Sequence, residues 1–108
     1  MGSNTVVIYA GAKAPESLIV TMKRKPGSSF DATTVTACEF VVRTETGDEV
    51  TWPATISSSS PDQVVASHTF DELGLETATP GRYRLFPYMT LAGGGQKRGV
   101  PLNLVIEP

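Results

Sequence analysis

Short runs rich in β-branched residues, separated by Gly, Pro and polar residues, constrain the fold of this chain more than any other feature. No stretch repeats its apolar residues with the 3.6-residue period of a long helix. Apolar and polar residues alternate instead with a period of two, which is typical of half-buried strands. The runs that we expect to form strands are 5–10, 17–23, 35–43, 50–56, 63–70, 81–89 and 100–106.

About seven short strands in 108 residues predict an all-β fold, an immunoglobulin-like antiparallel β-sandwich with Greek-key connections. The length suits a single domain, residues 1–108, and the chain has no internal repeat and no linker. A chain of this size buries roughly two-thirds of its unfolded surface, so its core needs neither a disulfide nor a metal. The single cysteine, Cys38, lies in an apolar run and is expected to be a small buried hydrophobic residue.

Two prolines lie inside predicted strands. Pro53 and Pro87 cannot donate a hydrogen bond to a neighbouring strand, so each is expected at a sheet edge or a bulge. Residues 57–61 are predicted to form a polar loop, and the three glycines at 93–95 a turn.

The segment 71–80 shows no strand pattern. Leu73 and Leu75 are expected to plug the base of the sandwich from a short helical turn. Tyr83 follows this segment closely, and two interpretations of it remain open. Its hydroxyl could return to the preceding corner, as in many Greek-key sandwiches, or it could be an ordinary core or surface tyrosine.

Composition excludes several partners. Nine Lys and Arg residues against eleven Asp and Glu residues leave no basic footprint for nucleic acid or for an anionic membrane. No apolar run approaches the ~20 residues that a membrane-spanning helix needs. Because the N-terminus lacks the pattern of a signal peptide, we expect synthesis in the cytoplasm of a bacterial host.

No pattern of catalytic or metal-binding residues emerges. His68 is the only histidine, so a site with several histidine ligands is excluded. Ser67, His68 and Asp71 do not form a catalytic triad, because neighbours on a strand point to opposite faces. We therefore expect no enzymatic activity, no cofactor and no metal, and we expect His68 to be a half-exposed surface residue.

An acidic cluster consists of Asp71, Glu72 and Glu76. It lacks the spacing of a calcium-binding loop, so Asp71 is expected to cap the turn that follows it.

The candidate interaction residues are two basic tips and one tryptophan. The tips are Lys23, Arg24 and Lys25 ahead of a Pro-Gly turn, and Lys97 and Arg98 after the three glycines. We interpret both as solvated tips that protect sheet edges from aggregation, or as groups that face acidic partners if several copies assemble in a ring. Trp52 would mark a binding patch if it is exposed and part of the core if it is buried.

Several segments resemble the immunoglobulin-like N-terminal domain of phage baseplate upper proteins and related small phage tail-associated proteins. They are the extended strand that begins Phe30-Asp31, the turn Thr46-Gly47, the strand start Pro80-Gly81-Arg82-Tyr83, the glycines 93–95 and the closing strand 100–106. The resemblance covers residues 17–108. It implies a sandwich domain without catalytic residues.

The resemblance further implies a structural component that is incorporated into a virion. Its partners would be other tail or virion proteins, or further copies of the chain in a homo-oligomer. The alternative function is a sandwich-type module of a larger bacterial protein that binds a carbohydrate or a protein.

Overall fold

Regular alternation of buried and exposed residues builds the layers of this protein. The structure is a computed structural model that describes residues 5–108. Along the second strand, Leu18, Val20 and Met22 are buried while their neighbours are exposed, because successive side chains of a strand point to opposite faces. The elements are β1 (Thr5–Tyr9), β2 (Ser17–Lys23), the 3-10 turn η1 (Ala32–Thr34), β3 (Val35–Thr44), β4 (Glu49–Ser60), β5 (Gln63–Thr69), β6 (Gly81–Leu91), β7 (Gln96–Arg98) and β8 (Leu102–Glu107).

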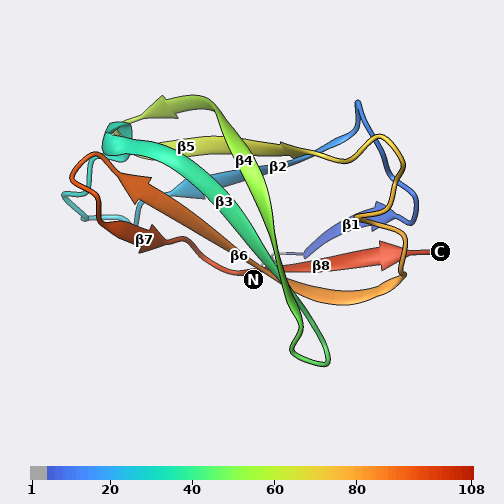
Figure 1. The fold of residues 1–108 in the computed structure, drawn as a ribbon. Coiled ribbons are helices and arrows are strands. Elements are labelled where there is room, and N and C mark those ends of the chain that lie inside the picture. The colour runs from blue at the N-terminus through green and yellow to red at the C-terminus, as the bar shows by residue number, and fades with distance from the viewer. Residues whose placement is uncertain (1–4) are drawn as a thin grey trace.

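The strands form an all-β sandwich of two layers (Figure 1). One layer holds β1, β8, β6, β3 and the first half of β4, with β7 paired to β6, and the other holds the second half of β4 with β5 and β2. The order β6-β3-β4-β5 is that of a Greek key, since β6 returns after two hairpins to lie beside β3. All neighbouring pairs are antiparallel except β1 with β8. The predicted fold class is therefore confirmed.

The core lies between the two layers and is apolar. Phe40 of β3 and Leu85 of β6 are almost completely enclosed, and Cys38 is buried beside them as predicted. The buried hydrophobic residues are Ala12, Leu18, Val20, Met22, Ala32, Val35, Cys38, Phe40, Val42, Trp52, Val64, Ala66, Phe70, Leu85, Met89, Leu104 and Ile106.

Strand β4 extends further than the sequence predicts. Residues 57–60, which we expected in a loop, continue β4 and pair with β5 after an irregularity between Ile56 and Ser58. The run of serines suggested a loop because it lacks apolar residues, but backbone hydrogen bonds to β5 hold it extended. A further short strand, β7, follows the turn at 93–95, so the sandwich has eight strands where about seven were expected.

Both internal prolines lie where a missing donor is tolerated. Pro53 belongs to the half of β4 that pairs with β3 alone, so its nitrogen faces the outer edge of that layer. Pro87 lies where β6 changes partner from β8 to β7: Leu85 pairs with Leu102 and Tyr88 with Arg98, so the partner chain carries one extra residue. Pro87 thus lies opposite residues 99–101, which belong to neither partner strand.

Leu73 and Leu75 do not plug the base of the sandwich, and that prediction is wrong. Their exposed fractions are 78% and 68%, the first of them the highest among the exposed large hydrophobic residues. The Tyr83 hydroxyl, by contrast, donates a hydrogen bond to the Thr79 carbonyl at 2.6 Å, so the corner interpretation of Tyr83 is the correct one. Within residues 5–108, no helix is both long enough and apolar enough to cross a membrane.

Candidate docking site

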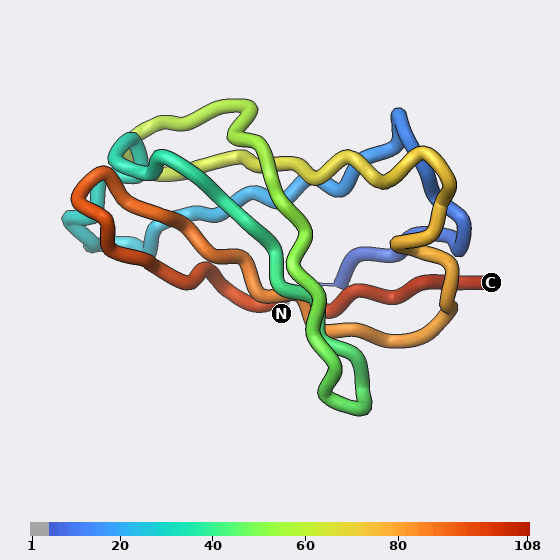
Figure 2. The backbone as a smooth tube through the Cα atoms, viewed as in Figure 1, coloured from blue at the N-terminus to red at the C-terminus, as the bar shows by residue number. Residues whose placement is uncertain are grey.

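The two basic tips, which lie far apart in the sequence, meet at one end of the sandwich. Lys23 is the last residue of β2, Arg24 and Lys25 follow it in the chain toward β3, and β7 carries Lys97 and Arg98. In Figure 2 these segments, light blue and orange-red, lie at the same end of the molecule. The Lys97 ammonium lies 4.7 Å from the centre of the Phe30 ring, so the two segments are in direct contact.

A groove of about 410 Å³ opens between these segments. It lies on the side of the sandwich where β2 is the edge strand of one layer and where β7 and β8 border the other layer. We call it the basic groove. Its lining residues are Val20, Thr21, Met22, Lys23, Arg24, Lys25, Ser28, Phe30, Met89, Lys97, Arg98, Gly99, Val100 and Leu102.

The basic groove combines apolar and cationic groups. Buried Val20, Met22 and Met89 lie at its inner side, and Val100 is 60% exposed at its outer side. The five cationic side chains are exposed, and within residues 5–108 no carboxylate lines the groove. Such a site favours an apolar ligand group that is accompanied by negative charge.

The rim cation Arg24 has both polar and acidic neighbours. It donates a hydrogen bond to the Phe30 carbonyl at 3.0 Å. Hydrogen bonds from Thr33, with a smaller contribution from Arg24, hold the pKa of Asp31 below its usual value. The pKa of Asp62 is likewise lowered, first by the Ser60 hydroxyl and to a smaller extent by nearby Arg24 and Lys23.

Among residues 5–108, the other rim cations form no ion pair within 4.0 Å. Lys25, Lys97 and Arg98 therefore keep their charge available for a partner. Arg98 also lies 5.7 Å from the centre of the ring of Phe86, a residue that is not among those lining the groove. Their role in binding stays a prediction.

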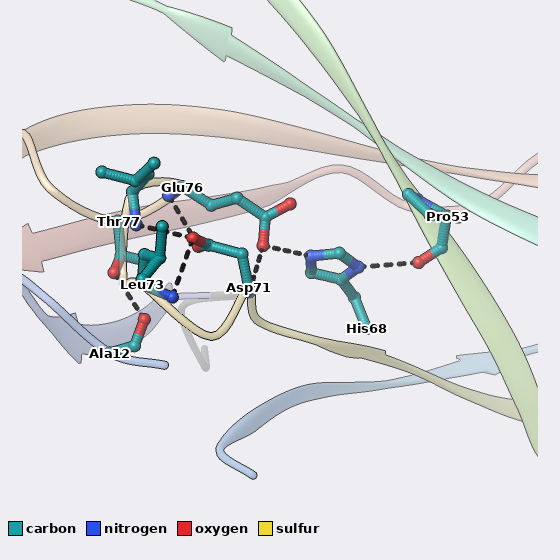
Figure 3. A network of polar contacts seen from close by, with 8 residues as sticks. Ala12, Pro53, His68, Asp71, Leu73, Glu76 and Thr77 are labelled. Atoms are coloured by element: carbon teal, nitrogen blue, oxygen red, sulfur yellow. Dashed lines mark hydrogen bonds and ion pairs between the residues drawn. The ribbon is translucent and has the colours of Figure 1, made fainter. Parts of the chain in front are cut away.

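At the opposite end of the sandwich, residues 71–77 form a rigid loop that we call the leucine loop (Figures 1 and 3). The Asp71 carboxylate accepts hydrogen bonds from the backbone N–H groups of Leu73, Leu75 and Glu76 at 3.2, 3.0 and 2.9 Å. These bonds lower the pKa of Asp71, the N–H groups of Glu76 and Leu75 having the largest effect. The predicted capping role of Asp71 is thus confirmed, although it caps a turn and not a helix.

Two buried contacts fasten the leucine loop to the chain between β1 and β2. Gly74 is buried with a φ of +71°, and a Cβ added there would lie 2.7 Å from the Gly11 carbonyl oxygen. The Thr77 hydroxyl, fully buried, donates a hydrogen bond to the Ala12 carbonyl at 2.9 Å (Figure 3). Because the glycine turns inward, the leucines on either side of it face solvent.

His68 is buried, so the prediction of a half-exposed surface histidine is wrong. Its Nδ1 lies 2.7 Å from the Pro53 carbonyl and its Nε2 lies 2.9 Å from Glu76 Oε1 (Figure 3). Its ring also stacks on Trp52 at a centroid distance of 5.0 Å. The sequence did not reveal this role because Pro53 and Glu76 reach His68 from other segments.

Trp52 is only 2% exposed and belongs to the core. Of its two predicted interpretations, the buried one is correct, and the indole offers no surface platform to a sugar or a peptide. The edge of the Phe70 ring packs against it at 5.7 Å. Within residues 5–108, no group of three or more His, Cys, Asp or Glu residues is arranged to hold a metal ion.

Comparison with known proteins identifies no family. No model of a known protein family matches the chain, and no curated protein matches it. A solved structure of murine CRIg is similar, with 12% sequence identity and a TM-score of 0.43, and the match covers 96% of this chain and 91% of that one. A similarity this low has no bearing on function.

Proposed function

We propose that this chain is a non-enzymatic assembly module that docks onto other proteins through the basic groove. The observation that carries the proposal is the convergence of five unpaired or weakly paired cations around an apolar groove. A groove with these properties fits an apolar side chain flanked by acidic residues, and such contacts give both affinity and orientation.

The side chains that could act as catalysts serve the fold instead. Both ring nitrogens of His68 contact acceptors inside the protein. Burial raises the pKa of the Cys38 thiol, which makes it a poor nucleophile at neutral pH. These observations support a structural role over a catalytic one.

The resemblance to small phage tail-associated domains supports a more specific proposal, that the chain is a tail or baseplate component of a phage or prophage. The resembling segments include the Gly81–Tyr83 strand start and the hairpin at 93–95, which carries the second basic tip. Its partners in this role would be tail proteins or further copies of itself. The burial of Trp52 weakens the alternative of a carbohydrate-binding module.

The test is the composition of tail particles purified from the encoding strain after prophage induction. We expect the chain in these particles, and we expect the double variant Lys97→Glu/Arg98→Glu to be lost from them. Arg82→Glu/Arg84→Glu is the matched control, since both arginines are exposed on β6 outside the groove. Absence of the wild-type chain from the particles would refute the tail proposal, and normal incorporation of the groove variant would refute docking through the groove.

A further inference from the structure

We infer that the leucine loop of one copy docks into the basic groove of the next copy, so that the chains associate head to tail. The inference rests on the proposed function and names the partner of the same groove. It begins from two surfaces that the fold leaves unused, one at each end of the molecule.

The two surfaces match in polarity. Leu73 and Leu75 are 78% and 68% exposed, although large apolar side chains on a braced loop would ordinarily turn inward. The basic groove has a volume of about 410 Å³, and its apolar lining includes Met22, Met89 and Val100. Insertion of the two leucines would remove apolar surface of both copies from water, which is the main favourable term in association.

The two surfaces also match in charge. Glu72 on the leucine loop and Glu16 on the adjoining chain are exposed and form no ion pair within residues 5–108, whereas Asp71 and Glu76 are held by internal hydrogen bonds. The same adjoining chain also carries one cation, Lys13, against these two carboxylates. Glu72 and Glu16 would face a groove whose rim carries five cations and no carboxylate. This complementarity favours the groove over the rest of the surface.

The leucine loop is organised before it binds. Three hydrogen bonds to Asp71, the buried Thr77 hydroxyl and the close approach of Gly74 to Gly11 hold its backbone. A loop that is already ordered loses little conformational entropy on docking, so more of the contact energy appears as affinity.

The positions of the two surfaces determine the type of assembly. They lie at opposite ends of a molecule that is 42 Å long, so no copy can fill its own groove with its own loop. A contact between two different surfaces is heterologous, and after each addition one loop and one groove remain free. Such contacts produce a ring when the rotation closes and a filament when it does not. A ring would suit a component of a tail.

Analytical ultracentrifugation of four proteins tests the inference. Wild-type protein is expected to increase in average mass with concentration, and less so in about 0.5 M NaCl, because salt screens the charged rim. The loop variant Leu73→Ser/Leu75→Ser and the groove variant Lys97→Glu/Arg98→Glu are each expected to stay monomeric. Val7→Ser/Tyr9→Ser, which removes exposed apolar groups from β1, is the matched control and should associate like wild type.

Mixing the two monomeric variants gives the decisive measurement. The loop variant keeps an intact groove and the groove variant keeps an intact loop, so a 1:1 mixture should form a heterodimer of twice the monomer mass that does not grow further. Circular dichroism and thermal unfolding establish that each variant is folded. Recovery of the heterodimer excludes misfolding as the reason why the single variants fail.

Three results would overturn the inference: a wild-type protein that stays monomeric up to about 1 mM, variants that do not associate on mixing, or a loop variant that still associates alone. These results differ from those that test the proposed function. A monomeric chain found in tail particles would refute self-docking and leave the tail proposal standing. A chain that assembles head to tail but is missing from the particles would refute the tail proposal and leave self-docking standing.

Discussion

The imidazole of His68 lies between two acceptors and against the face of an indole. Pro53 O and Glu76 Oε1 contact its two ring nitrogens, and Trp52 stacks on it with an angle of 13° between the rings. At the residue scale, this polar side chain joins β4, β5 and the leucine loop.

Replacing His68 by Ala should lower the free energy of unfolding by about 3 kcal/mol, because it leaves a cavity beside Trp52 and removes the partners of Pro53 and Glu76. Urea unfolding followed by tryptophan fluorescence measures the change. Thr69→Ala, at an exposed position of the same strand, is the control and should change stability little. Equal stabilities for the two variants would contradict a structural role of His68.

The Tyr83 hydroxyl fastens the end of the 71–80 segment to β6 through the Thr79 carbonyl. Tyr83→Phe should therefore cost about 1 kcal/mol of stability, the usual contribution of one hydrogen bond. Tyr88→Phe on the same strand is the matched control, since no hydrogen bond of its hydroxyl is found within residues 5–108. A loss of the same size in both variants would show that the corner hydrogen bond contributes nothing specific.

At the scale of elements, the features particular to this sandwich lie in its loops more than in its strands. The leucine loop has almost no apolar anchor of its own and depends on two carboxylates, one glycine and one hydroxyl. Strand β4 shows a related dependence, because its second half is held by β5 and not by a buried apolar face of its own. The conformation of both elements therefore depends on contacts with other segments.

The leucine loop should weaken in acid. The folded protein holds the pKa of Asp71 below its ordinary value of 3.8, so the carboxylate stabilises the fold fully above that value and progressively less as the pH falls through the folded pKa. Asp71→Asn lacks this contribution. The stability difference between wild type and Asp71→Asn should be largest above about pH 4.5 and should shrink toward pH 2, as urea unfolding across this range would show. A difference that does not change with pH would contradict the role of the ionised carboxylate.

At the scale of the whole molecule, a single apolar core joins both layers. Phe40 and Leu85 from neighbouring strands of one layer face Val64 and Ala66 from the other, and each is at most 1% exposed. The polarity of the two ends is the second whole-molecule property, with cations around a groove at one end and exposed leucines beside carboxylates at the other.

Cys38 can report on the opening of this core, because it is the only cysteine and is 7% exposed. Its reaction with a thiol reagent at neutral pH should be at least on the order of a thousandfold slower in the folded protein than in urea, given the usual stability of small domains. His68→Ala should speed the reaction. A native rate close to that of the unfolded chain would mean that the thiol is reached without global unfolding.

Much of the fold could be predicted because strand signals are local. The run 35–43 identified β3, Cys38 was expected to be buried, and the glycines at 93–95 marked a turn. The prediction failed where side chains or backbone find partners far along the chain. Residues 57–60 pair with β5, and His68 is enclosed by Pro53 and Glu76.

The sequence by itself determined the all-β class, the single core and the positions of most strands, because alternation with a period of two and turn residues act over a few neighbouring positions. Only the tertiary structure decided that Lys23–Lys25 and Lys97–Arg98 surround one groove, since this depends on the order of strands in the two layers. The tertiary structure also left Leu73 and Leu75 exposed. Gly74 between them packs against the Gly11 backbone, and no local pattern records where that distant segment lies.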